Sequence, residues 1–170
     1  MKKLTKWLAA ALAVLMLAAM LTACGGGGGS SAEIDGPGVS NATTKDLEAA
    51  WLAHYNNDLF PDEPAKQNTL QKQAEDFLRN ALAHMDPETR VVEQQYVKGY
   101  VGVNGSGKTI RAEVKVEEQV SGNTYLIAAY TKEQMKEEIS SVIFGRMSKV
   151  GFAVLEYDGL YYWAYALVLD

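Results

Sequence analysis

The feature that most restricts the fold of this 170-residue chain is a division near Cys24. Trp7 to Ala23, before Cys24, form an uncharged apolar run of 17 residues, and five glycines follow Cys24 directly. A basic start (Lys2, Lys3 and Lys6), an apolar run and small residues at its exit are typical of an export signal that is removed. The alternative is a membrane-spanning helix, but the run is short for one and no charged residue stops it. A globular core must therefore be built from later residues.

Leu21-Thr22-Ala23-Cys24 resembles the lipobox of bacterial lipoproteins, a motif of small residues that ends in an invariant cysteine. The resemblance covers residues 1–24. It implies that a diacylglyceryl group is attached to the sulfur of Cys24 and that the chain is cleaved after Ala23. Two acyl chains give stable anchoring where one holds a protein only marginally. We therefore expect a lipid anchor on the outer face of the bacterial cell membrane, or on the outer membrane in a cell with two.

This division predicts three parts: a signal peptide over residues 1–23, a lipidated cysteine with a Gly/Ser tether over 24–42, and one globular domain over 43–170. Cys24 is the only cysteine, so the domain has neither an internal disulfide nor a cysteine nucleophile. The net charge of the chain is −5, and loss of the three signal lysines lowers it to −8. An acidic domain repels phosphate backbones, so we do not expect a nucleic-acid partner.

Apolar residues at helical spacing predict three helices in the domain. The first begins near Thr43, the second ends at Asp86-Pro87, and the third opens with a capping box formed by Thr131 and Gln134. A second capping box is expected from Asn68 and Gln71. The residues that recur at helical spacing in the first helix are Leu47, Ala50, Trp51, His54 and Tyr55. The second has one continuous apolar face of Leu70, Ala74, Phe77, Leu78, Ala81, Leu82 and Met85, and the third is expected to bury Met135, Ile139, Val142 and Ile143. Gly145 is expected to end the third helix.

Between and after these helices the apolar period changes to two, which predicts strands. Tyr96 to Val103 and Ile110 to Val116 are expected to pair as a hairpin, and Tyr125 to Ala129 to form another strand. Val150 to Glu156 and Leu160 to Leu169 form a hairpin across Asp158-Gly159. The order is α-α-β-β-β-α-β-β. It predicts an α+β domain with a mostly antiparallel sheet of about five strands and helices on one face.

One motif has the form of a nucleotide-binding P-loop. Residues from Gly102 to Thr109 fit G-x-x-x-x-G-K-[ST], in which backbone amides and a following helix hold phosphates. The residues that follow alternate like a strand, so we interpret the motif as a glycine-rich hairpin turn and expect no nucleotide.

Candidate metal and catalytic residues are sparse. His54 and His84 are the only histidines, and no H-x-x-x-H spacing or cysteine partner joins them, so packing or partial exposure on helices is the favoured interpretation. Asp58, Asp62 and Glu63 form a small acidic loop without the ligand spacing of a calcium site. Glu117-Glu118 and Glu137-Glu138 are adjacent pairs whose side chains diverge. We therefore expect no metal and no cofactor.

The last strand is rich in aromatic residues on both of its faces, which predicts a strand buried on two sides. The alternative is an exposed aromatic surface that stacks on sugar rings or on a peptide. The residues of this candidate binding surface are Tyr161, Tyr162, Trp163 and Tyr165.

Val150-Gly151-Phe152-Ala153-Val154, followed by Tyr161-Tyr162-Trp163-Ala164, also resembles the closing hairpin of extracellular CAP-type (SCP-like) domains. The resemblance covers about twenty residues. Gly145-Arg146 stands where that family has a Gly-His-Arg segment, so the histidine is missing. The kinship implies a degenerate domain that has lost the family's metal-binding histidines and retains a binding role.

Together these observations predict a non-enzymatic lipoprotein domain that binds an envelope polymer or a protein through its sheet or loops. The alternative is a hydrolase that acts on envelope polymer. A pocket that holds His54 or His84 beside a buried carboxylate would favour the hydrolase.

Overall fold

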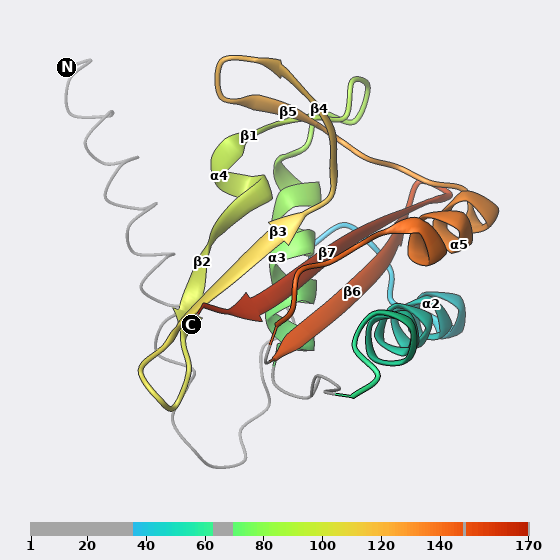
Figure 1. Ribbon diagram of the computed structural model, residues 1–170. Coiled ribbons are helices and arrows are strands. Elements are labelled where there is room, and N and C mark those ends of the chain that lie inside the picture. Colours follow the sequence, from blue (N-terminus) through green and yellow to red (C-terminus); the bar gives the residue numbers. More distant parts are fainter. Residues whose placement is uncertain (1–35, 63–69, 148, 170) are drawn as a thin grey trace. The chain divides into compact units, whose positions relative to one another are not determined.

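Two antiparallel sheets organise the part of the chain that the computed structural model describes, residues 36–62, 70–147 and 149–169. The larger sheet has the order β2 (Lys98–Val103), β3 (Thr109–Val114), β7 (Leu160–Val168), β6 (Val150–Tyr157). The smaller has the order β1 (Val91–Glu93), β5 (Thr124–Ile127), β4 (Val116–Ser121) (Figure 1). The expected α+β class with antiparallel strands is confirmed, although two sheets stand in place of the single sheet of about five strands.

The helices of this region are α2 (Ala42–Ala53), η1 (His54–Leu59), α3 (Gln71–His84), α4 (Gln94–Val97) and α5 (Lys132–Ser141). A capping box between Asn41 and Thr44 starts α2, and the predicted box of Thr131 and Gln134 starts α5. The wider π-helical turn η1 continues α2 without a break. The short strand β1 and the single-turn helix α4 have no counterpart in the predicted order.

Helix α3 covers one face of the larger sheet (Figure 1). Its apolar stripe is buried as predicted, with Phe77, Leu78 and Leu82 packed over the alanines of β3 and β7. Those alanines, Ala112, Ala164 and Ala166, are fully buried and leave room for the larger helical side chains. The helix ends at His84, just before Asp86-Pro87, as expected from proline's missing N–H donor.

Helices α2 and α5 cover the other face of β6 and β7, so the expectation of helices on one face only is wrong. Trp51 of α2 and Met135 of α5 are fully buried against Phe152 and Trp163 of the sheet. The reason is that β6 and β7 are apolar on both faces, and each face requires its own cover. The prediction that the last strand is buried on two sides is confirmed.

The strand expected over residues 110–116 divides at Lys115, whose backbone N–H donates to the carbonyl of Trp163 at 3.0 Å. Ile110, Ala112 and Val114 are buried as the alternation predicts, but Val116 begins β4 in the smaller sheet. The chain therefore passes from one sheet to the other at a single residue.

The closing hairpin is confirmed, with eight cross-strand pairs from Val150↔Leu167 to Tyr157↔Leu160. Its turn has positive φ at both central residues, 51° at Asp158 and 73° at Gly159. Two left-handed residues give the backbone twist of a type I′ turn, which matches the twist of the strands.

The end of the third helix differs from the prediction. Helix α5 ends at Ser141 rather than at Gly145, and Ile143, expected in the core, is 86% exposed. Residues 142–147 instead run as an irregular segment over the edge of the aromatic core.

Residues 1–35, which hold the predicted signal, lipobox and most of the tether, lie outside the described residues, as does Asn68 of the second expected capping box. Among the described helices, none combines the length and apolarity needed to span a membrane.

Candidate functional site

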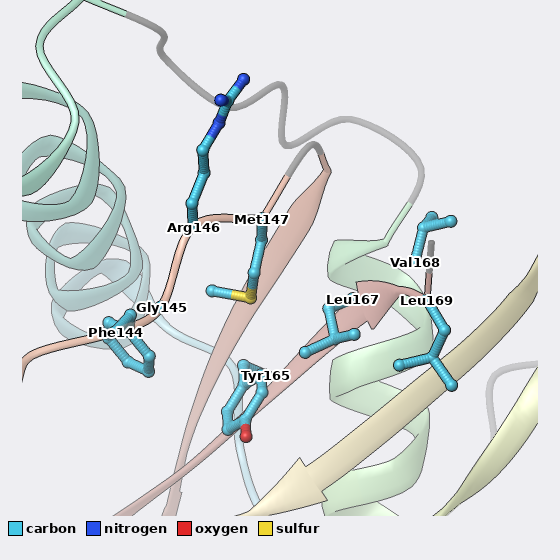
Figure 2. Close-up of a pocket in the computed structure, with 8 residues that line it drawn as sticks. All are labelled: Phe144, Gly145, Arg146, Met147, Tyr165, Leu167, Val168 and Leu169. Atoms are coloured by element: carbon cyan, nitrogen blue, oxygen red, sulfur yellow. The ribbon is translucent and has the colours of Figure 1, made fainter.

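A hollow of about 370 Å³ lies where the C-terminal end of β7 meets the irregular segment 142–147. We call it the first hollow. Figure 2 shows Phe144, Met147, Tyr165 and Leu167 directed toward a common space, with Arg146 at the rim and extending away from them. The lining is otherwise completed by Gly145, Val168 and Leu169. A concave, mostly apolar surface of this size falls within the range of ligand-binding pockets.

The segment that walls the first hollow is held at both ends by η1. His54 Nε2 lies 3.0 Å from the carbonyl oxygen of Val142, and its Nδ1 lies 2.8 Å from Asp58 Oδ2. At the other end, the hydroxyl of Tyr55 accepts the N–H of Met147 at 2.5 Å and donates to the carbonyl of the same residue at 3.2 Å. A segment without regular secondary structure thereby has backbone groups at both of its ends paired.

Phe144 fixes the middle of this segment by packing on aromatic rings. Its ring centroid lies 5.6 Å from Trp51, 6.0 Å from Trp163 and 5.7 Å from Tyr165, each close to edge-to-face. Such pairs add to the free energy gained by burial alone. The wall of the hollow is therefore continuous with the aromatic core.

The β7 side of the first hollow continues onto an uncovered, charged part of the sheet. Glu113 pairs in register with Tyr165 and receives Arg111 Nη2 at 2.5 Å and Lys98 Nζ at 3.7 Å. Burial raises the pKa of the Tyr165 phenol, and the Glu113 carboxylate raises it further. The Tyr165 phenol is therefore neutral at physiological pH, and its hydrogen bond to the Glu113 carboxylate holds it at the edge of the first hollow.

A second hollow of about 330 Å³ lies at the end of η1 and is lined by Leu59, Phe60, Pro61, Asp62 and Arg146. Arg146 is common to both hollows. Its charge also acts on Tyr55, whose pKa is raised by burial and partly lowered by this guanidinium. Arg146 therefore connects the two hollows beside the η1 turn.

Of the four aromatic residues of the predicted binding surface, two are buried in the core and two are half-buried. Tyr162 is 2% and Trp163 1% exposed, so neither offers a surface. Tyr162 and Trp163 cannot be part of the candidate site, because helices cover β7 on both faces at these two residues. Tyr161 and Tyr165 are half-buried, and Tyr165 is the one that lines the first hollow.

The two histidines lie apart from both hollows. His54 is engaged as described above, and His84 stacks on Tyr96 with ring centroids 3.9 Å apart while its Nδ1 lies 2.8 Å from the carbonyl of Asn80. His54 is thus largely packed, whereas His84 is exposed on its helix. Asp58 pairs with His54 and Asp62 lines the second hollow, while Glu63 lies outside the described residues. The described ranges contain no cluster of three or more metal-binding side chains.

One residue of each adjacent acidic pair forms an ion pair with a different basic residue. Glu117 lies 3.5 Å from Arg90, and Glu138 lies 2.9 Å from Lys115.

The P-loop-like residues form the hairpin turn between β2 and β3, as interpreted from the sequence. The side chain of Asn104 accepts the backbone N–H of Ser106 at 3.0 Å and of Lys108 at 2.9 Å. Strand β3 follows the motif directly, so its amides do not continue into a helix N-terminus.

Two further residues escaped prediction. Glu48 is 2% exposed and accepts hydrogen bonds from the Val154 backbone at 3.1 Å, from Lys45 at 3.0 Å and from the Gln71 amide. Burial raises the pKa of its carboxyl, while the Val154 N–H and Lys45 oppose the rise. Met147 gave no periodic signal because it lies outside any helix or strand. The Gly145-Arg146 pair was singled out only through the CAP-type resemblance.

No known protein family, curated protein or solved structure matches this chain.

Proposed function

We propose that the chain is a lipid-anchored, extracytoplasmic binding protein whose domain receives an apolar or aromatic group of a ligand or protein partner in the first hollow. The observation that carries the binding role is the apolar space between segment 142–147 and β7, which no described helix covers. The lining residues of the two hollows include neither His54 nor His84, which favours a binding role over the alternative of an envelope-polymer hydrolase.

The first hollow has the properties of a preformed site. Both ends of its wall are tied by hydrogen bonds to η1, and Phe144 is braced against three aromatic rings. A preformed surface binds with less loss of conformational entropy than one that must be ordered first.

The binding role is testable with indole as the probe, in amide-resolved NMR on the chain from residue 24 onward with Cys24 replaced by alanine. At millimolar indole, we expect shift changes at residues 144–147 and 165–169, and their loss in Leu169→Asp, which places a carboxylate in the apolar lining. Val120→Asp is the matched control, since Val120 is an apolar residue that is 50% exposed in the smaller sheet. Shifts confined to other regions, or unchanged in Leu169→Asp, would remove the first hollow as the site.

The anchor is supported by residues 1–24 alone: a basic start, an apolar run and a lipobox-like end at the single cysteine. Replacing Cys24 with alanine should abolish incorporation of a labelled fatty acid and move the protein out of the membrane fraction of the cell. Replacing the neighbouring Thr22 with serine, another small residue, is the control that should retain the label. Equal labelling of the Cys24→Ala protein would end the proposal.

A further inference from the structure

Both ring nitrogens of His54 face oxygen atoms that accept hydrogen bonds. Nδ1 lies 2.8 Å from Oδ2 of the Asp58 carboxylate, and Nε2 lies 3.0 Å from the backbone carbonyl oxygen of Val142. A neutral imidazole has one N–H donor, whereas an imidazolium has two. Only the protonated ring therefore donates to both oxygens, and it then joins the η1 turn to the wall of the first hollow.

The two hydrogen bonds of this ring differ in strength. The Asp58 carboxylate is an anionic acceptor, and a hydrogen bond to an ionised group is about twice as strong as one between neutral groups. The Val142 carbonyl is a neutral acceptor. When the ring has a single proton, that proton therefore stays on Nδ1, which faces the carboxylate. The proton that leaves to solvent is the one on Nε2, and this is the proton that binds Val142.

Loss of the Nε2 proton affects one end of the wall and leaves the other end in place. The unprotonated nitrogen has its lone pair directed at the Val142 oxygen, so the two acceptors repel each other and the carbonyl loses its donor. At the other end, Met147 is held by the Tyr55 hydroxyl, whose pKa is raised by burial. Titration of His54 therefore releases the wall where it leaves α5.

Among the described residues, Asp58 is the one charged side chain in contact with the His54 ring. Glu138 of α5 is paired with Lys115 at 2.9 Å, and Arg146 and Asp62 line the second hollow. Asp58 therefore determines which nitrogen keeps the proton. The remaining charged residues on the elements packed against α2 are Glu156 of β6 and Lys132, Glu133, Lys136 and Glu137 of α5.

We propose that His54 is a proton-dependent clamp on the first hollow: the protonated ring fixes Val142 and the wall that begins there, and the neutral ring releases them. The inference rests on the proposed binding role of the first hollow and adds its regulation by pH. Histidine is the side chain that changes its charge between about pH 5 and pH 8. The wall is therefore fixed in acid and loosened in alkali. A loosened wall must be ordered again when a ligand binds, which weakens binding.

The first test observes the ring directly, by NMR of the chain from residue 24 with Cys24→Ala and ¹⁵N-labelled histidine. Long-range ¹H–¹⁵N correlations distinguish protonated from unprotonated ring nitrogens. We expect both nitrogens of His54 to be protonated at about pH 5 and Nδ1 alone at about pH 9, with a change in the ¹³C shift of the Val142 carbonyl between them. A neutral ring with its proton on Nε2 overturns the clamp, because that tautomer keeps the hydrogen bond to Val142.

The second test measures indole affinity at the same two pH values in matched variants. The unsubstituted domain should bind indole about three- to tenfold more weakly at the higher pH, the size expected for one hydrogen bond. Asp58→Asn should remove this difference, because an amide can donate to Nδ1 and let the neutral ring keep its proton on Nε2. His84→Gln is the control that should keep the difference, because His84 contacts Tyr96 and Asn80 instead of the wall.

The outcomes separate this inference from the function on which it rests. Equal indole affinity at the two pH values, an undiminished pH effect in Asp58→Asn, or its loss in His84→Gln overturns the clamp, while indole binding in the first hollow still stands. Failure of indole to perturb residues 144–147 at either pH overturns the proposed function. The His54 nitrogens and the Val142 carbonyl then still decide whether the clamp exists, because their resonances are observed without a ligand.

Discussion

The Tyr55 hydroxyl lies between the two backbone polar groups of Met147, accepting from the N–H at 2.5 Å and donating to the carbonyl at 3.2 Å. A side chain of the π-helical turn η1 thereby pairs both backbone groups of a residue 92 positions later in the chain, as a neighbouring strand would do in a sheet. Since Tyr55 is fully buried, neither Met147 group has an equivalent partner in solvent at that position.

Tyr55→Phe should therefore destabilise the domain by about 1–3 kcal/mol, the cost of leaving buried backbone groups unpaired. The measurement is urea unfolding followed by tryptophan fluorescence. Tyr100→Phe is the control, because Tyr100 is 75% exposed and its variant should remain within about 0.5 kcal/mol of the wild type. Equal stability of the two variants would mean that the Tyr55–Met147 contacts contribute nothing.

Phe144 and Ile143 are neighbours in sequence with opposite environments. Phe144 packs against three rings, whereas Ile143 is 86% exposed. Phe144→Ala should cost about 2 kcal/mol, less than the full loss of a completely buried phenylalanine, and should weaken indole binding. Ile143→Ala should stay within about 0.5 kcal/mol of the wild type. A larger loss for Ile143→Ala would restore the sequence-based expectation that this residue is in the core.

Glu48 should give the folded state a measurable dependence on pH. Its pKa is raised in the folded protein above the ordinary value of 4.5, mainly by burial. The folded state thus binds this proton more tightly than the unfolded state, and its contribution to stability falls as pH rises from about 4.5 through the folded-state pKa. Glu48→Gln cannot titrate, so the stability of the wild type relative to this variant should decline between pH 4.5 and neutral pH. A relative stability that rises over that interval would contradict the prediction.

Gly151 lies where the start of α3 approaches β6. A Cβ atom at this position would overlap the backbone of Leu70 and Gln71, which cannot move aside as the end of a flexible side chain can. Gly151→Ala should therefore shift α3 and destabilise the domain by about 1–3 kcal/mol, within the range for overpacked sites. Gly105→Ala in the β2–β3 turn is the control, since a Cβ there has no neighbour within 4 Å. Thermal unfolding of the two variants would compare them directly.

Most helices and strands were predictable because their periods were long and consistent. The apolar stripe of α3 and the alternation of β3 each report a local geometry that tertiary packing then follows. The division between two sheets at Lys115 was not predictable, because the residues on either side continue the same alternation. Lys115 donates its N–H to the carbonyl of Trp163 and accepts the N–H of Ala128, and both partners are distant in sequence. The two apolar faces of β7 implied that both faces are covered, but the sequence did not indicate which helices cover each face.

The candidate site was far less predictable than the fold. Tyr165 was identified from its strand, but Phe144 and Met147 belong to a segment whose conformation depends on His54 and Tyr55, about 90 positions away. No local period encodes such contacts. The burial of Glu48 was not predictable either, because its partner, the Val154 backbone, is likewise distant in sequence.

Strand β6 is the last strand of the larger sheet, and its outer edge is closed without another strand. Val39 exchanges backbone hydrogen bonds with Glu156 at 2.8 and 3.0 Å, and the Glu48 carboxylate takes the N–H of Val154. The unpaired backbone groups of an open sheet edge can pair with a strand of another molecule. At these positions the backbone donors are already used, so crowded copies of the domain cannot join through them into a shared sheet.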